Sequence, residues 1–406
     1  MKSPFFNMNL LGVFVLIISS WQCDDNRIEA DLSHLPLDMD TVSIDLISFS
    51  SYRIAPNLGS NDRLYLGTKN SLDVPLSFIG IKDHYYWSNS LDSTVTVDSL
   101  HFILYSSDSL LTQSSTPNLF FNSDSQFNES KSTYLDFVGY SIADWESLGQ
   151  PNVIVNTDTS GIFTYTELVW DIMSIDSMLT DTVDSNLIRN FAIQMTNSDT
   201  NFIELFSREA TSGDGPMDPK VKMYYRQNFV VDDSTVHDTV NVTIYSFGDI
   251  SIIDPGPIDT ESMNLGLSNG IGLRSLVSIS FDSASIPEGS LIRKALLSLP
   301  IDTSDSSDGY NIIVDPIDES VDTADVVFET DPYPEIGYPY RISSDIENGM
   351  FIISLKSFLQ NITLGNETNL GFKVVANEKN DPFESIHFDI ENESAKPILE
   401  IIYVAN

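Results

Sequence analysis

The amino-acid sequence predicts an all-β protein built from two tandem antiparallel β-sandwiches. Three observations lead to this prediction. Short runs of alternating polar and apolar residues recur along the chain, amphipathic helical segments are scarce, and the second half repeats landmarks of the first half in the same order. A chain of 406 residues is also longer than one ordinary core requires, which favours two domains.

The strand pattern is clearest in four short runs, at residues 41–46, 94–98, 242–245 and 277–281. Each run alternates polar and apolar side chains and is bounded by Ser, Asp, Asn, Gly or Pro, which is typical of a half-buried strand. Because no amphipathic helices lie between the runs, the pattern favours sandwiches over α/β folds. We expect helices only as short local segments, around residues 172–178 and 355–361.

An internal repeat divides the chain into two parts. Its four landmarks keep their order, with residues 64–67 matching 263–266, 76–81 matching 276–281, 190–193 matching 369–372, and 203–225 matching 386–403. The last landmark is the most detailed, because Ile203 and Leu205 correspond to Ile386 and Phe388, and each copy then reaches a strand that ends in Tyr. The repeat predicts a first domain over residues 41–232 and a second over 233–406.

The repeat also carries a family resemblance. Residues 274–282 (RSLVSISFD), 286–292 (IPEGSLI) and 295–299 (ALLSL) resemble the centre of the DNRLRE-type domain, and residues 205–221 resemble its closing motif. The resemblance is strongest over 274–299 and 202–225. It implies a jelly-roll β-sandwich related to carbohydrate-binding modules.

Each copy departs from that family at one motif. The first copy has no matching Phe-Asp and Ile-Pro-Gly centre, and the second has no Ser-Arg-Glu. Arg208 and Glu209 supply the Arg-Glu of the first copy. We expect them to form structural ion pairs or to cap a loop, with ligand binding as the alternative.

The first residues are typical of a bacterial export signal. Residues 1–22 contain a short apolar stretch, over 10–18, that is too short to span a bilayer as a helix, and the only cysteine of the chain, Cys23, follows directly. This layout resembles a lipoprotein signal and predicts that Cys23 is lipidated, with residues 23–40 forming a tether. Because residues 20–22 (SWQ) depart from the usual lipobox, an ordinary secretory signal cut near Ser20 is the alternative. Either way the protein is expected to be exported, and lipidation would make it an outer-membrane lipoprotein facing the periplasm or the cell surface.

Composition and motifs argue against several functions. The chain carries 59 acidic and 20 basic residues, for a net charge of −39, and such a surface repels nucleic acid. A single cysteine excludes an intrachain disulfide or a thiolate metal cluster. The five histidines show no metal-binding spacing, and no Gly-x-Ser-x-Gly or Gly-rich phosphate loop occurs. We therefore expect a protein that is not an enzyme.

Two groups of residues are candidate binding sites. Exposed aromatic side chains stack on sugar rings, and the densest aromatic cluster is Tyr85, Tyr86 and Trp87, with Trp145 as a further candidate. Core packing is the alternative for all four, although three consecutive aromatic residues cannot all face inward on a strand.

The second group is acidic. Asp302, Asp305 and Asp308 are spaced by three residues and end at a glycine, so they form a candidate Ca²⁺ site, with a solvated loop as the alternative.

These expectations combine into one hypothesis for function. We expect a non-catalytic envelope lipoprotein whose β-sandwich modules bind a polysaccharide or matrix, or mediate adhesion, and which contacts the membrane through its lipid anchor only. The alternative is a structural or assembly protein that binds another envelope protein by strand addition. A hydrolase that uses a carboxylate site is the third hypothesis.

Overall fold

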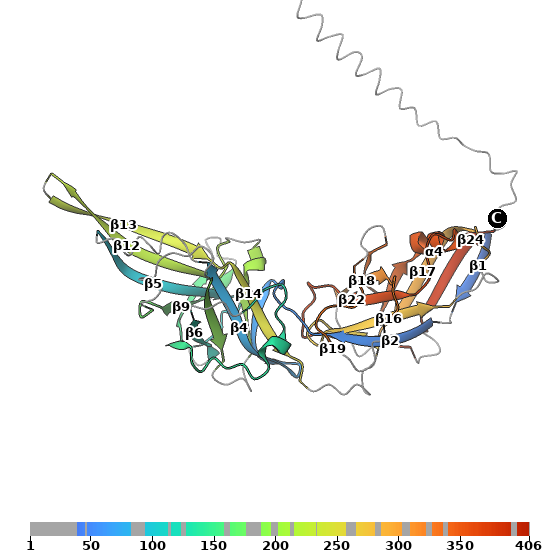
Figure 1. Ribbon diagram of the computed structural model, residues 1–406, viewed down its shortest axis with the longest axis horizontal. Coiled ribbons are helices and arrows are strands. Elements are labelled where there is room, and N and C mark those ends of the chain that lie inside the picture. The colour runs from blue at the N-terminus through green and yellow to red at the C-terminus, as the bar shows by residue number, and fades with distance from the viewer. Residues whose placement is uncertain are drawn as a thin grey trace, which may run out of the picture.

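The computed structural model confirms the all-β prediction, since about 58% of the residues that it describes lie in strands and 6% in helices. It describes residues 39–405 except 45–46, 83–93, 113–114, 123–126, 158–162, 176–187, 196–201, 212–214, 233, 257–264, 281–285, 303–308, 322–326, 336–339 and 391–395. The strands form two lobes that follow one another end to end along the long axis of the molecule (Figure 1). Each lobe has its own hydrophobic core. No helix among the described residues is long and apolar enough to cross a bilayer.

The N-lobe, residues 63–254, contains two antiparallel sheets. The spatial order of the first is β11 (Phe202–Phe206), β3 (Arg63–Lys69), β4 (Leu72–Lys82), β10 (Ile188–Gln194), β6 (Asn118–Asn122) and β7 (Glu146–Gly149), with β14 (Gly248–Asp254) also beside β4. The order of the second is β13 (Ser234–Tyr245), β12 (Lys220–Val231), β5 (Val95–Ser106), β9 (Thr164–Asp171) and β8 (Asn152–Thr157). Inward side chains of both sheets meet in one core, where the rings of Phe102 and Phe191 stack with centroids 4.4 Å apart.

The C-lobe combines residues 266–404 with residues 39–54. Its ten-stranded path runs β1 (Met39–Ile44), β24 (Ile398–Val404), β17 (Leu291–Pro300), β21 (Met350–Ser354), β20 (Ile342–Glu347), β18 (Asn311–Pro316), β22 (Phe372–Ala376), β16 (Leu273–Ile279), β2 (Ile47–Ile54) and β19 (Val327–Phe328). Strand β20 pairs with β18 through its first residues and with β21 through its last, so the path bends at β20 around one core. A two-stranded sheet of β15 (Gly266–Leu267) and β23 (Ile386–His387) packs beside it.

The three described helical segments are short. Two are single 3₁₀ turns, η3 (Tyr134–Phe137) and η4 (Arg208–Thr211). The third, α4 (Lys356–Thr363), lies where a short helix was expected, and it buries Phe358 and Leu359 against the C-lobe core. It ends just before Gly365, whose φ of +72° favours glycine and allows the chain to turn away.

The predicted domain boundaries are wrong at the start of the chain. We expected residues 41–232 to form one domain, yet β1 pairs with β24 and β2 pairs with β16, so both strands belong to the C-lobe. Conversely, β13 and β14, which follow residue 232, pair with β12 and β4 in the N-lobe. Alternating side chains show which face of a strand is buried, but they do not show which sheet receives it, and this limit explains the error.

The two lobes contact each other directly. Phe383 of the C-lobe lies against Tyr65 and Phe202 of the N-lobe, with ring centroids 5.1 Å and 4.9 Å apart, and Lys69 Nζ lies 2.7 Å from Asp381 Oδ2. Two connectors also join the lobes, residues 55–62 between β2 and β3 and residues 255–265 between β14 and β15. The lobes are therefore joined twice by the chain, and both apolar and ionic contacts hold them together.

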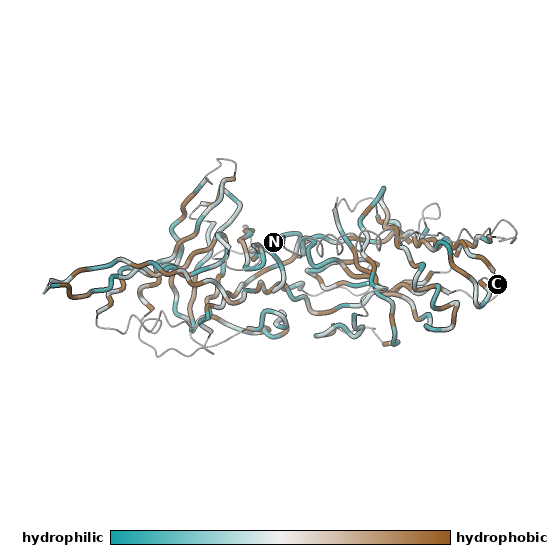
Figure 2. The backbone as a smooth tube through the Cα atoms, turned by 90° about the horizontal axis from the view of Figure 1, so that it is seen from above, coloured by the Kyte–Doolittle hydropathy of each residue, from teal (hydrophilic) through white to brown (hydrophobic). Residues whose placement is uncertain are grey.

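A hairpin arm extends from the N-lobe. Strands β12 and β13 remain paired to Val231 and Ser234, whereas β5 accompanies β12 only as far as Gln227. The free part of the arm carries four exposed apolar side chains, Phe229, Val230, Val231 and Val236. The arm tip and the start of β1 lie at opposite ends of the molecule (Figure 1), and hydrophobic residues near the tip are visible in Figure 2.

Candidate functional site

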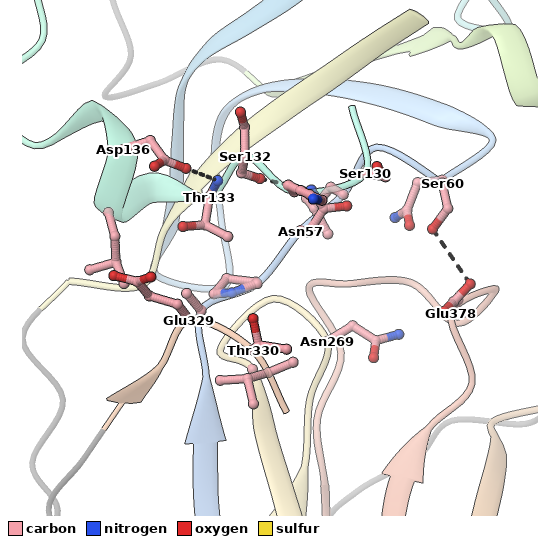
Figure 3. A pocket seen from close by; sticks show the side chains of 18 of the residues that line it. Asn57, Ser60, Ser130, Ser132, Thr133, Asp136, Asn269, Glu329, Thr330 and Glu378 are labelled. Atoms are coloured by element: carbon pink, nitrogen blue, oxygen red, sulfur yellow. Dashed lines mark hydrogen bonds between the residues drawn. The ribbon is translucent and has the colours of Figure 1, made fainter. Parts of the chain in front are cut away.

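A cavity lined by both lobes lies between them. This interlobe cavity has a volume of about 760 Å³, within the range of roughly 300–1,000 Å³ typical of ligand sites. Its lining comes from the connector after β2, the loop before η3, the start of β16 and the segment after β19. Figure 3 shows polar side chains from both lobes around it, including Asn57, Ser60, Thr133, Thr330 and Glu378.

Side-chain-to-backbone hydrogen bonds hold one wall of the cavity. Asn57 Nδ2 donates to the carbonyl oxygens of Glu129 and Ser132, at 2.9 Å and 2.7 Å, so the connector is tied to the loop before η3. Gly59 lies directly against this loop, since a Cβ there would stand 2.0 Å from the Glu129 carbonyl oxygen. The wall is thus fixed by backbone contacts, and ordering it on ligand binding would cost little entropy.

A capping box positions the next part of the wall. The Thr133 backbone N–H donates to Asp136 Oδ2 at 2.8 Å, and the Thr133 side chain accepts from the backbone of the same turn. This exchange satisfies the orphan donors at the start of η3. Thr133 and Asp136 thereby reach the interlobe cavity from one side of η3 (Figure 3).

The exposed part of the lining is rich in hydroxyl and carboxylate groups. Ser60, Ser130 and Thr330 contribute hydroxyl groups, and Asp136, Glu329 and Glu378 contribute carboxylates; all six residues are exposed. Ser60 Oγ reaches Glu378 Oε2 across the lobe boundary at 3.5 Å. Of the two basic residues in the lining, Arg274 is paired with Asp331, which leaves Lys131 against three carboxylates. The cavity therefore disfavours anions and suits a neutral ligand with many hydroxyl groups.

A second cavity lies on the other side of η3. It has a volume of about 490 Å³, and aromatic rings dominate its lining, from Phe120, Tyr134, Phe137 and Tyr140. Polar groups of Gln194 and Asp254 share this lining. Phe137 also stacks on the buried Phe78, with centroids 4.9 Å apart, so the core supports the aromatic wall. Consecutive residues of η3 thus serve two cavities, one polar and one aromatic.

Trp145 does not serve as a sugar platform. The sequence left it as a candidate, but the structure buries it to 8% exposure in an apolar cluster, where its ring lies 5.9 Å from that of Phe78. Its face is covered by neighbouring side chains and is not available to a ligand. The alternative, core packing, is the correct one for this residue.

Arg208 and Glu209 lie in a cluster of carboxylates. They open η4, and the Arg208 guanidinium lies 3.8 Å from Glu209 Oε1. Carboxylate oxygens of Glu129, Glu209 and Asp249 lie within 4.8 Å of one another. The Arg208 backbone N–H donates to Asp249 Oδ2, and the Asp249 backbone N–H donates to Glu129 Oε1, each at 2.9 Å. Arg208 and Glu209 thus form an ion pair with each other, and the backbone of Arg208 also binds the buried carboxyl group of Asp249.

Burial and like charge govern this cluster. Asp249 is 1% exposed, and burial, reinforced by the neighbouring Glu209 charge, raises the pKa of its carboxyl well above the usual range. Burial and the Glu129 charge also raise the pKa of Glu209. Three carboxylate groups at this spacing could ligate a cation or share protons, and these three are the described acidic residues best placed to do so.

Other predicted site residues lie wholly or partly outside the described residues. Tyr85, Tyr86 and Trp87 lie outside them, as does Cys23. Of the predicted Ca²⁺ ligands, Asp302 is exposed just after β17, whereas Asp305 and Asp308 lie outside the described residues. The aromatic, calcium and lipidation hypotheses for these positions remain predictions.

Sequence reasoning missed the residues that line the interlobe cavity. Only the Thr133-x-x-Asp136 pattern, a recognisable capping box, marks any of them locally. Glu329 and Thr330 follow the short strand β19, and nothing in their sequence context marks them as belonging to a cavity. Glu129 and Asp249, 120 residues apart, meet only in the folded lobe.

Comparison with known proteins gives no match of any kind to this chain, whether against family models, curated protein sequences or solved structures.

Proposed function

We propose that this protein is a non-catalytic binding protein of the cell envelope, and that its interlobe cavity takes a neutral glycan segment. The observation that carries the proposal is the lining contributed by both lobes, with hydroxyl, amide and carboxylate groups around a space of about 760 Å³. Sugars are recognised by such directional hydrogen bonds, usually with an aromatic face nearby. The aromatic cavity on the other side of η3 supplies rings next to the polar site.

The export signal and Cys23 support the envelope location, and the resemblance to carbohydrate-binding-module-like domains supports the ligand class. The net charge of −39 is compatible with a neutral glycan and unfavourable for an anionic one. The carboxylates of Glu129, Glu209 and Asp249 lie close to one another, and Asp249 accepts a hydrogen bond from the backbone of the Arg208 turn. We assign this cluster no catalytic role.

A glycan array probed with the chain from Asn26 onward, which contains every described strand, tests the proposal. We expect binding to neutral oligosaccharides. The double variant Thr330→Val with Glu329→Gln should weaken it about tenfold, since the first change removes a hydroxyl group and the second replaces a charged carboxylate acceptor with a neutral amide, at a cost of roughly 0.5–1.5 kcal/mol each. Both residues are exposed, so the fold should be unaffected.

The matched control makes the same two chemical changes elsewhere. Thr235→Val lies in the hairpin arm and Glu347→Gln at the end of β20; both positions are exposed, and neither lines the two cavities. The control should bind like the unaltered protein. An array without any bound glycan, or equal losses in both double variants, would contradict glycan binding in the interlobe cavity.

A second candidate function is assembly with another envelope protein through the hairpin arm. Strand β13 is the edge of its sheet, and its outer side pairs with no other described strand along residues 234–245. An edge of this length accepts an added strand. The exposed side chains of Phe229, Val230, Val231 and Val236 would give such a strand apolar contacts.

A further inference from the structure

The strand pair β1–β2 is a copy of the strand pair β13–β14. In β1, Val42 and Ile44 lie opposite Ile401 and Leu399 of β24; in β13, Val242 and Ile244 lie opposite Met223 and Val221 of β12. The numbers differ by 200 at each step. The same spacing continues in the second strand of each pair, where Phe49 lies opposite Val277 and Asp249 lies opposite Ile79.

The acceptor strands correspond as well. Val221 and Tyr225 of β12 match Leu399 and Tyr403 of β24, which is the correspondence that the sequence repeat predicted. Strands β4 and β16 match through their other neighbours, because Ile79 lies opposite Phe191 and Val277 lies opposite Phe372. Equivalent serines make equivalent bonds: Ser77 Oγ donates to the Tyr65 carbonyl at 2.7 Å, and Ser275 Oγ to the Gly266 carbonyl at 2.9 Å.

Four further strand pairs of each lobe follow the same correspondence. The pairs β5–β9, β6–β10, β3–β11 and β5–β12 of the N-lobe have counterparts in β17–β21, β18–β22, β15–β23 and β17–β24 of the C-lobe. The chain thus contains this part of the connectivity twice, whereas β19, which pairs with β2, has no counterpart among the described strands of the N-lobe. In sequence, one unit covers residues 39–231 and the other residues 234–404, and they meet at the tip of the hairpin arm.

Sequence and space disagree about which strand pair belongs to which unit. The pair β1–β2 begins the first unit, yet it pairs with strands of the second unit in the C-lobe. The pair β13–β14 begins the second unit, yet it pairs with strands of the first unit in the N-lobe. Reciprocal exchange of an identical element is the defining feature of a strand-swapped dimer. We propose that this protein is a strand-swapped dimer of one β-sandwich unit, fused into a single chain at the arm tip.

The partner surface implied by this exchange is a second copy of the unit. Each lobe presents two receiving edges, β24 and β16 in the C-lobe and β12 and β4 in the N-lobe, and the other unit fills them with its opening strand pair. The buried side chains of the donated strands are part of each core; Ile44 and Ile250 are 6% and 0% exposed. The covalent link through residues 232–233 is therefore not needed to hold the two units together.

Cleavage at the arm tip tests the proposal. A protease recognition sequence inserted between Asp232 and Asp233 of the chain from Asn26 onward is cut after folding, and the product is analysed by size-exclusion chromatography with light scattering. We expect one particle with the mass of the uncut chain. We also expect the two pieces to separate only in denaturant, together with the loss of the β-sheet circular dichroism signal.

The apolar contact between the lobes could hold two independent domains together, so the cleaved variant Phe383→Ser separates the two explanations. This change removes the ring that Tyr65 and Phe202 pack against and leaves every residue of the exchanged strands unaltered. With exchanged strands, the cleaved Phe383→Ser protein still elutes as one particle. Two separate species of half the mass, each with β-sheet signal, would overturn the proposal.

Discussion

At the scale of single residues, the most unusual feature is the buried acid Asp249. Its carboxyl group keeps one backbone hydrogen bond, from Arg208, and lies beside two further carboxylates. A raised pKa in the folded state means that folding favours the protonated form. Stability from this group is therefore fully present below the ordinary carboxyl pKa of about 4 and is lost as the pH rises through the higher folded-state value.

The variant Asp249→Asn removes this titration while keeping an oxygen for the Arg208 N–H. We expect its melting temperature to exceed that of the unaltered protein by a margin that widens as the pH rises from 4 to 8. The exposed arm variant Asp238→Asn is the control and should show a constant difference. A difference in melting temperature between Asp249→Asn and the unaltered protein that stays constant from pH 4 to 8 would contradict the raised pKa of Asp249.

At the scale of elements, the hairpin arm differs most from an ordinary sandwich strand pair. Its free ribbon exposes Val230 to 73%, whereas Val221 of the same strand β12 is fully buried. A two-stranded ribbon is marginally stable alone, and apolar side chains there do not contribute to a core. Their exposure, on the end of the molecule away from the start of β1, is the observation on which the proposed assembly role of the arm rests.

The double variant Val230→Lys with Val236→Lys tests the arm as an assembly surface. Because both side chains are exposed, we expect the free energy of unfolding to change by less than about 0.5 kcal/mol. An envelope protein that co-purifies with the unaltered chain should be lost with this variant. It should be retained with Leu110→Lys and Leu364→Lys, which change exposed apolar residues outside the arm. Equal retention in both variants would exclude the arm as the contact.

The sequence predicted individual strands and the helix better than it predicted which strands pair with each other. The alternating run at 242–245 lies in β13 and the short helix near 355–361 is α4. In the repeat, Ile203 and Ile386 correspond as expected, since each lies in a matching strand opposite Leu66 and Leu267. Three other predicted matches, of residues 64–67 with 263–266, 76–81 with 276–281 and 190–193 with 369–372, are each two residues out of register in the structure. A shift of two residues leaves the same side chains facing inward, so the alternating pattern does not reveal it.

The candidate cavities could not be predicted for a different reason. Their residues come from loops of both lobes, and a cavity of this kind depends on how the lobes are placed. The aromatic residues that sequence reasoning favoured were judged by type alone, and Trp145 shows the limit of that argument, since its burial depends on β-strand neighbours far along the chain. The spacing of Thr133 and Asp136 fits a capping box, but nothing in the sequence marks either residue as lining a cavity.

At the scale of the whole molecule, the repeat boundary and the lobe boundary differ. The repeat changes copies at the arm tip, near residues 232–234, as the sequence predicted. The two sequence units instead exchange their opening strand pairs, so that β2 and β3, like β14 and β15, lie in different lobes. Because residues 54–58, 60 and 61 also line the interlobe cavity, the exchange helps to fix the proposed binding site.

The most direct test of this account is a disulfide placed between exchanged strands. The chain from Asn26 onward contains no cysteine, and Ser43 lies opposite Glu400 in β1 and β24. We predict that Ser43→Cys with Glu400→Cys forms an intramolecular disulfide on mild oxidation, because directly opposed strand residues have the required Cα separation of about 4.4–6.8 Å.

Thr243 of β13 is the equivalent of Ser43, and it lies opposite Lys222 of β12. If β1 paired within its own unit, Ser43 would lie opposite Lys222. We predict that Ser43→Cys with Lys222→Cys stays reduced under the same conditions. Peptide mapping that finds the disulfide between positions 43 and 222, and none between 43 and 400, would contradict the exchange of strands between the lobes.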